Sequence, residues 1–227
     1  MKKIILIIIA VIIILVLGLF GWRVWYYYKL IKSGQLTPAT NSVHFNKTTV
    51  KPKAAVKTQP ANLVAVYAPH FGSTDAKITL VEFADFNCSF SAESFPAIRE
   101  LLAKYPDKIN FVFRFFPTSN DAARNAALAA MCAQEQNKFL IYHDKLFQNR
   151  GKFGLDDLKN YAIQTGLNSE VFNQCLESKK FDKQIENDLS DALLLGVEGT
   201  PTFFLNGEKL EGAIPFSAWE TVIRNIK

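Results

Sequence analysis

The apolar positions of this chain fall into two unlike regions. Residues 4–20 are all apolar or glycine, a run long enough for a helix to cross the hydrocarbon core of a bilayer. Lysines precede the run, and a cluster of tryptophan and tyrosine residues follows it, as is common where a helix meets a membrane surface. We therefore expect residues 1–32 to form an N-terminal transmembrane segment with an aromatic and basic flank.

The same run could instead be a secretory signal that is removed. It is longer than the apolar core of a typical signal peptide, and no small-residue cleavage site follows it. These two features favour an uncleaved signal-anchor, and the cleaved signal stays as the alternative.

The next part of the chain changes character. Residues 33–60 hold few large hydrophobic side chains and are rich in threonine, lysine, proline and alanine, which predicts a flexible basic linker. From there on the pattern is that of a folded domain, which we place at residues 61–227.

Two apolar runs in this domain have the length and residue types of buried strands, residues 77–86 and 109–116. A helix is expected to follow the first strand, from Cys88 to about Lys104, with Pro96 bending it. A stretch at about 118–196 has no convincing strand and is interrupted at glycines, so it predicts several helices.

The end of the domain carries a hairpin signal. Residues 202–205 and 209–211 flank Asn206-Gly207, a favoured turn dipeptide, and residues 216–226 look like a closing helix. The order of elements predicts an α/β sheet domain with a helical insertion.

Charge separates the two regions as well. Nine of the 26 basic residues lie in residues 1–60, whereas all 21 acidic residues come later. The net charge of +5 therefore belongs to the N-terminal part, which would lie near anionic headgroups. The folded part is net acidic, so no nucleic-acid partner is expected.

The candidate chemistry starts at Cys88, between a strand and a helix. A cysteine at a helix N-terminus faces unpaired backbone N–H groups and the positive end of the helix dipole, and both favour the nucleophilic thiolate. The plain alternative is a buried structural cysteine. The chain has three cysteines, so at least one stays unpaired within it.

Two further features lie in or beside strands. Glu82 interrupts an apolar strand, either as an exposed edge residue or as a buried acid with a raised pKa. Thr200-Pro201 opens a strand, where a cis bond would be unusual and an ordinary trans proline ending a loop is the alternative.

Four segments in their order and spacing resemble the DsbA-like branch of the thioredoxin superfamily, in particular its membrane-anchored thioredoxin-like members. The segments cover most of residues 67–214; they are residues 81–90, 132–140, 142–147 and 195–207. The resemblance implies a thioredoxin-like fold with a helical insertion.

It also implies roles for single residues. Cys88 would be the attacking cysteine and Glu82 the buried acid. Thr200 and Pro201 would form the cis-proline loop that pairs with substrate backbone, and Phe90 would contact substrate beside it.

The sequence departs from the family pattern at Ser91, where the family has a second cysteine. A serine cannot form a disulfide, although its hydroxyl can donate a hydrogen bond to the Cys88 thiolate. An internal dithiol cycle is therefore excluded, and release of a bound substrate needs another thiol.

The other two cysteines, Cys132 and Cys175, are expected to pair as a structural disulfide, as in related proteins, with two separate buried thiols as the alternative. Neither is expected to reach Cys88. His143 is expected to make a structural hydrogen bond. No spacing of cysteine and histidine predicts a metal site, and no cofactor is expected.

These observations lead to a functional hypothesis. The chain is expected to be a membrane-tethered, extracytoplasmic thiol-disulfide oxidoreductase that exchanges, isomerises or reduces protein disulfides through one thiol. Its partners would be proteins with thiols or disulfides, together with a membrane redox partner or a low-molecular-weight thiol. The alternative is a redox-inactive, chaperone-like binding module that uses the same groove.

Overall fold

The computed structural model describes Gly18, Trp22, Trp25, Lys29 and residues 63–226. Contacts divide the chain into two units, Met1–Ala54 and Ala55–Lys227. Among the described residues, no helix has the length and apolarity that a membrane crossing requires. The expected membrane segment at 1–32 lies almost wholly outside these residues, and the expected linker at 33–60 lies wholly outside them.

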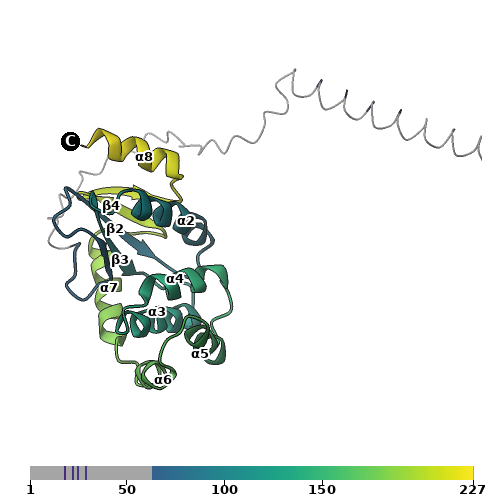
Figure 1. Cartoon of the computed structure of the whole chain (residues 1–227), viewed down its shortest axis with the longest axis vertical. Helices are drawn as coiled ribbons and strands as arrows, with labels where there is room; N and C mark the ends of the chain where they lie inside the picture. The colour runs from purple at the N-terminus through teal and green to yellow at the C-terminus, as the bar shows by residue number, and fades with distance from the viewer. Residues whose placement is uncertain (1–17, 19–21, 23–24, 26–28, 30–62, 227) are drawn as a thin grey trace, which may run out of the picture. The chain divides into compact units, whose positions relative to one another are not determined.

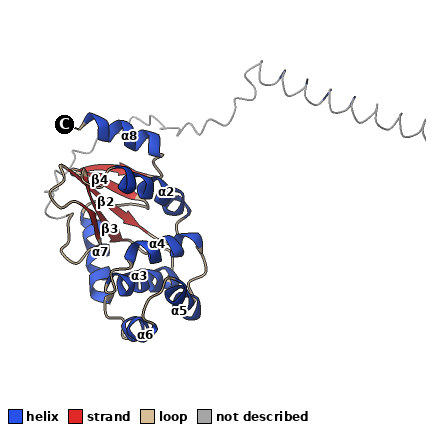
Figure 2. Ribbon diagram, in the orientation of Figure 1, coloured by secondary structure: helices blue, strands red, loops and turns tan. Residues whose placement is uncertain are grey.

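The described part of the second unit is an α/β fold with a five-stranded sheet in the order β1-β3-β2-β4-β5 (Figures 1 and 2). The strands are β1 (His70–Gly72), β2 (Ile78–Ala84), β3 (Ile109–Phe115), β4 (Thr202–Leu205) and β5 (Glu208–Glu211). The β2–β3 pair is parallel and the other three pairs are antiparallel.

The central strands are covered on both faces, which explains why apolar residues occur on both faces of each strand. Residues of β3 alternate between two core clusters. Phe111 and Phe113 join the larger cluster together with residues of helix α2 (Ser89–Lys104), whereas Val112 joins a smaller cluster on the opposite face. Helix α8 (Phe216–Asn225) packs beside α2.

Five helices lie between β3 and β4 along the chain, while the sheet itself is continuous. They are α3 (Asp121–Gln134), α4 (Phe139–Gln148), α5 (Leu155–Gln164), α6 (Ser169–Glu177) and α7 (Asp182–Leu194). Asparagine side chains start two of them, because Asn120 accepts from the N–H of Ala123 and Asn168 accepts from the N–H groups of the first turn of α6.

A buried ion pair joins β3 to α7. Arg114 and Asp188 are fully buried, and Nε of Arg114 lies 2.6 Å from Oδ1 of Asp188. The other carboxylate oxygen accepts from the N–H of Phe115, and the arginine also donates to the carbonyl of Leu63. These bonds give both charged groups partners. Burial of either charge without such partners would be costly.

The predicted elements differ from the observed ones in detail. Strand β1 has no counterpart in the sequence interpretation. Helix α2 begins one residue later than expected, because the backbone of Cys88 is extended, and it contains Pro96 within its length. Strand β2 is shorter than predicted at both ends, and β5 starts one residue earlier than expected.

Candidate active site at the start of helix α2

Cys88 occupies the N-cap position of helix α2. Its backbone is extended, with φ −76° and ψ 129°, and its N–H donates to the carbonyl of Asp85 at 3.0 Å. The thiol is free and partly exposed. No side chain caps the helix, and its first turn holds no acidic residue, so no acid within the helix offsets the positive end of the helix dipole at Cys88.

The sulfur of Cys88 contacts the loop before β4. Its S–H donates to the carbonyl of Thr200 at 3.1 Å, and the Thr200–Pro201 peptide bond is cis. The loop is held by its neighbours, since the hydroxyl of Thr202 donates to Gly199 and the N–H of Gly212 donates to Pro201. The fold thus brings together residues that lie more than a hundred positions apart.

Glu82 lies on the sheet face that helix α2 covers. Leu80 and Ala84, which flank it on that face, belong to the core cluster that includes Ile98 of α2. The carboxyl group is 1% exposed, and its Oε1 has no hydrogen-bond partner among the described residues. Burial raises the pKa of Glu82 to about 8, because desolvation disfavours the charged carboxylate.

Ser91 lies one turn into α2 on its inner face and is fully buried. Its hydroxyl has no hydrogen-bond partner in the described part of the chain. In this structure, in which Cys88 is a thiol, Ser91 makes no hydrogen bond to it. The physical reason is that Cys88 precedes the helix with an extended backbone, and its sulfur is bonded to Thr200 instead.

Phe90 lies in the first turn of α2, two residues after Cys88, and is 59% exposed. Its large apolar side chain is therefore accessible from solvent.

Asp85 is a site residue that the sequence interpretation missed. It is buried, and its carboxylate accepts three backbone N–H groups: Oδ1 bonds Asn87 at 2.8 Å, and Oδ2 bonds Thr118 and Ser119 at 3.2 Å each. It thereby fastens the turn before Cys88 to the loop that follows β3. An aspartate in a turn often accepts a hydrogen bond from the backbone N–H two residues later. The bond from Asn87 to Asp85 could therefore have been predicted from the sequence.

Arg150 is a second residue outside the sequence prediction. It follows helix α4 and is exposed, and its Nη1 donates to the carbonyl of Asn87 at 3.3 Å. A positive charge therefore lies near the residue before Cys88.

The remaining cysteines and histidine lie in the helical region. Cys132 of α3 and Cys175 of α6 form a disulfide and are both buried. His143 is buried among aromatic rings, with Nδ1 2.9 Å from Oδ1 of Asp144, and burial lowers the pKa of His143. The described residues contain no cluster of side chains that could hold a metal ion.

Comparison with known proteins places this geometry in context. A family model described as thioredoxin matches residues 65–225. The chain is 34% identical over 154 residues to Na(+)/H(+) antiporter NhaA 3 of Salinispora tropica, a match that covers 67% of this chain and 24% of the antiporter. It is 33% identical over 142 residues to the NhaA antiporter of Herminiimonas arsenicoxydans. The chain spans about a quarter of the length of these relatives.

Solved structures share the fold. The thiol-disulfide exchange protein alpha-DsbA2 of Wolbachia pipientis superposes with a TM-score of 0.68 at 20% identity, over 74% of this chain and 91% of that one. A periplasmic thioredoxin-like protein of Salmonella enterica serovar Typhimurium gives a TM-score of 0.62 at 27% identity, over 73% and 93% of the two chains. Oxidised BdbD of Bacillus subtilis gives 0.61 at 24% identity, over 70% and 91%.

Proposed function

The chain belongs to the thioredoxin family and has a DsbA-like fold, and from this premise we propose that it is a thiol-disulfide oxidoreductase that acts through the single thiol of Cys88. The observation that carries the proposal is the position of a free, partly exposed sulfur at an uncapped helix N-terminus, next to the Thr200-Pro201 loop. A partly exposed thiol in such a setting is suited to nucleophilic attack.

The first step is attack on a disulfide of the substrate. The Cys88 thiolate forms a mixed disulfide with one substrate sulfur, and the other substrate sulfur leaves as a thiolate that takes up a proton. Glu82 is a candidate source of that proton, because its raised pKa leaves the carboxyl group largely protonated at neutral pH.

The second step needs a thiol from outside the site. Ser91 cannot attack the mixed disulfide, and Cys132 and Cys175 are buried and bonded to each other. If a second substrate thiolate attacks, a new substrate disulfide forms and Cys88 is restored, which is isomerisation. If a small thiol attacks, it releases the substrate as a thiol and stays attached to Cys88 as a mixed disulfide. A second molecule of the small thiol then restores Cys88, and the two small molecules leave as their own disulfide.

The surface around the sulfur would hold the substrate. Phe90 offers an exposed apolar contact, and Thr200 and Pro201 form the adjoining loop. We assign these three residues to substrate binding, with an extended polypeptide as the ligand.

The site would operate outside the cytoplasm on a membrane tether formed by residues 1–32. A disulfide between Cys132 and Cys175 is typical of an oxidising compartment. The relatives support the same location, since two are sodium–proton antiporters and one similar structure is of a periplasmic protein.

One observation favours a second function, a binding module without electron transfer. Ser91 stands where an internal resolving thiol would lie, and binding of a polypeptide at the Thr200-Pro201 loop needs no such thiol. The two functions differ in whether covalent adducts form at Cys88.

The deciding experiment isolates the full chain from cells after acid quenching and thiol blocking. We expect adducts on non-reducing gels that disappear in Cys88→Ser and persist in Arg224→Gln, which changes an exposed arginine on α8. Mass spectrometry would identify the attached proteins. If the native chain carries no adduct at Cys88 and does not exchange with a model disulfide, the oxidoreductase proposal fails and the binding module stands.

A further inference from the structure

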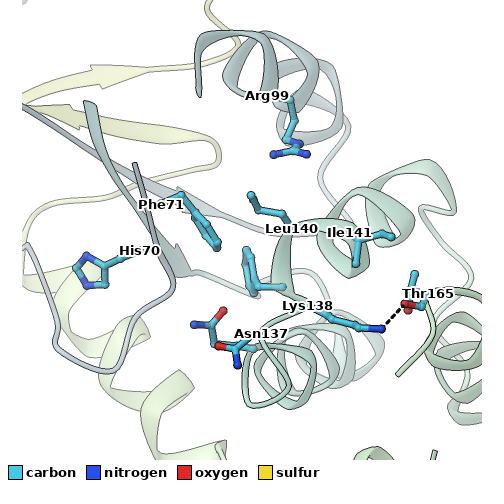
Figure 3. A pocket seen from close by; sticks show the side chains of 10 residues that line it. His70, Phe71, Arg99, Asn137, Lys138, Leu140, Ile141 and Thr165 are labelled. Atoms are coloured by element: carbon cyan, nitrogen blue, oxygen red, sulfur yellow. Dashed lines mark hydrogen bonds between the residues drawn. The ribbon is translucent and has the colours of Figure 1, made fainter. Parts of the chain in front are cut away.

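A pocket of about 550 Å³ lies away from the thiol, between edge strand β1, helix α2 and the junction of α3 with α4 (Figure 3). Its volume is within the range of small-molecule sites in proteins. None of its lining residues, which all belong to the described segment 63–226, is acidic, and two of them, Arg99 and Lys138, are basic.

Arg99 is held in a fixed orientation at this pocket. Its Nε donates to Oδ2 of Asp144 at 3.0 Å, and Oδ1 of the same carboxylate lies 2.9 Å from Nδ1 of the buried His143. The carboxylate thus occupies only one edge of the guanidinium. The two Nη groups make no hydrogen bond to any described residue, and Figure 3 shows the side chain reaching from α2 toward Leu140 and Phe71.

The free edge of Arg99 matches the geometry of a carboxylate. Two parallel N–H donors in a rigid plane can bind both oxygens of one carboxylate group. Asp144 neutralises part of the arginine charge, but it also restricts the side chain, which lowers the entropy that a ligand would otherwise lose on binding.

The rest of the pocket combines an apolar wall with a second cation. Phe71 stacks on Phe139 at 5.4 Å between ring centroids, and the exposed Ile141 adds to the wall. Lys138 donates only to the carbonyls of Thr165 and Gly166, so its charge has no carboxylate partner among the described residues.

We propose that this pocket binds a carboxylate carried on an apolar group, with the carboxylate on the Nη edge of Arg99 and the apolar group against Phe71, Leu140 and Ile141. A small aryl acid and the free C-terminus of a polypeptide ending in an apolar residue share this chemistry. The site is separate from Cys88 and does not depend on the oxidoreductase proposal.

The test is calorimetric titration of the full chain with phenylacetate, and with phenylacetamide as the neutral probe of the same shape. We expect phenylacetate to bind with a Kd of about 1 mM and phenylacetamide to bind at least tenfold more weakly. N-acetyl-alanyl-phenylalanine, as free acid and as amide, forms the peptide arm. Whichever free acid binds more tightly identifies the source of the carboxylate.

Variants locate the binding. Arg99→Gln should weaken phenylacetate binding at least tenfold, whereas Arg224→Gln, which removes another arginine paired with a carboxylate, should leave it unchanged. Ile141 is 54% exposed, so Ile141→Glu should fold normally. It should weaken phenylacetate binding, because it removes an apolar contact and adds a charge that repels the carboxylate. Equal binding of acid and amide, or binding that is indifferent to both Arg99→Gln and Ile141→Glu, would overturn the proposal.

Discussion

The sulfur of Cys88 donates a hydrogen bond to the carbonyl oxygen of Thr200 at 3.1 Å. Only the thiol can make this bond, because a thiolate has no hydrogen to donate. A mixed disulfide at Cys88 would remove this hydrogen and break the bond. The Thr200 carbonyl could then accept an N–H group from a bound polypeptide.

Ser91→Cys should convert the site from one thiol to two. The new cysteine would lie three residues after Cys88, the spacing at which a helix start can hold a disulfide. We expect an internal disulfide in the purified variant and at least a fivefold decrease in mixed disulfides with substrates, because the second thiol releases them. Thiol labelling with mass spectrometry, before and after reduction, measures both quantities.

Ser94→Cys is the matched control for this variant. Ser94 is also buried on the inner face of α2, but it lies a further turn from Cys88. The Ser94→Cys variant should therefore leave the amount of mixed disulfide with substrates at its native level. Equal loss of adducts in both variants would mean that resolution by a neighbouring thiol is not the cause.

Glu82→Gln should remove a dependence of stability on pH. Because burial raises the pKa of Glu82 to about 8, the folded chain binds a proton that the unfolded chain loses near pH 4.5. The free energy of unfolding should therefore fall as pH rises from about 4.5 to 8, by about 3 kcal/mol at pH 7.

The variant cannot ionise, so this decline should be absent in Glu82→Gln and present in Glu208→Gln, which changes an exposed acid on β5. Urea titrations at several pH values measure the difference. Parallel pH profiles for the native chain and Glu82→Gln would show that the carboxyl group is not neutral in the folded state.

The central strands and the helix after Cys88 could be predicted because their information is local. Residues 78–84 and 109–115 are mostly apolar and rich in β-branched and aromatic side chains, and Asn206-Gly207 marks the hairpin turn through its own backbone preference. The family model and the similar structures confirm the thioredoxin-like fold with its helical insertion.

What the sequence did not reveal depends on remote partners. Strand β1 has three residues and exists through its pairing with β3. Arg114 lies within a strand that was expected to be apolar, and its partner Asp188 comes from a helix 74 positions later. Asp85 reads locally as a turn residue, and only the fold brings the N–H groups of Thr118 and Ser119 to its carboxylate.

Asp85→Ala should lower both stability and the reactivity of Cys88. Three backbone N–H groups would lose their acceptor, and since two of them can bind water instead, we expect a loss of about 2 kcal/mol in the free energy of unfolding. The turn before Cys88 would loosen, and alkylation of Cys88 by iodoacetamide should slow several-fold while the chain is still folded.

Asp85→Asn keeps one acceptor oxygen and should recover part of the alkylation rate. Recovery of stability without recovery of the rate would limit Asp85 to a structural role. A native alkylation rate in Asp85→Ala would exclude it as a positioning residue.

Removing the disulfide with Cys132→Ser and Cys175→Ser together should destabilise the folded domain. The bond closes a loop with a sequence separation of 43, and the entropic model gives a loss of about 4 kcal/mol. Guanidinium titration of the double variant against the oxidised native chain measures the loss. A difference below about 1 kcal/mol would mean that helices α3 and α6 hold together without it.

The three cysteines also pose a problem of sorting during synthesis. Cys88 precedes Cys132 by almost the same number of residues that separate Cys132 from Cys175, so chain entropy hardly distinguishes the correct bond from the wrong one. Cys88 and Cys132 also leave the ribosome before the native partner does. The native disulfide therefore forms correctly only if α3 and α6 pack together early, or if a catalyst exchanges a premature bond. A chain with Cys88 in the wrong disulfide would be incompletely folded, and its free thiol would be lost as well.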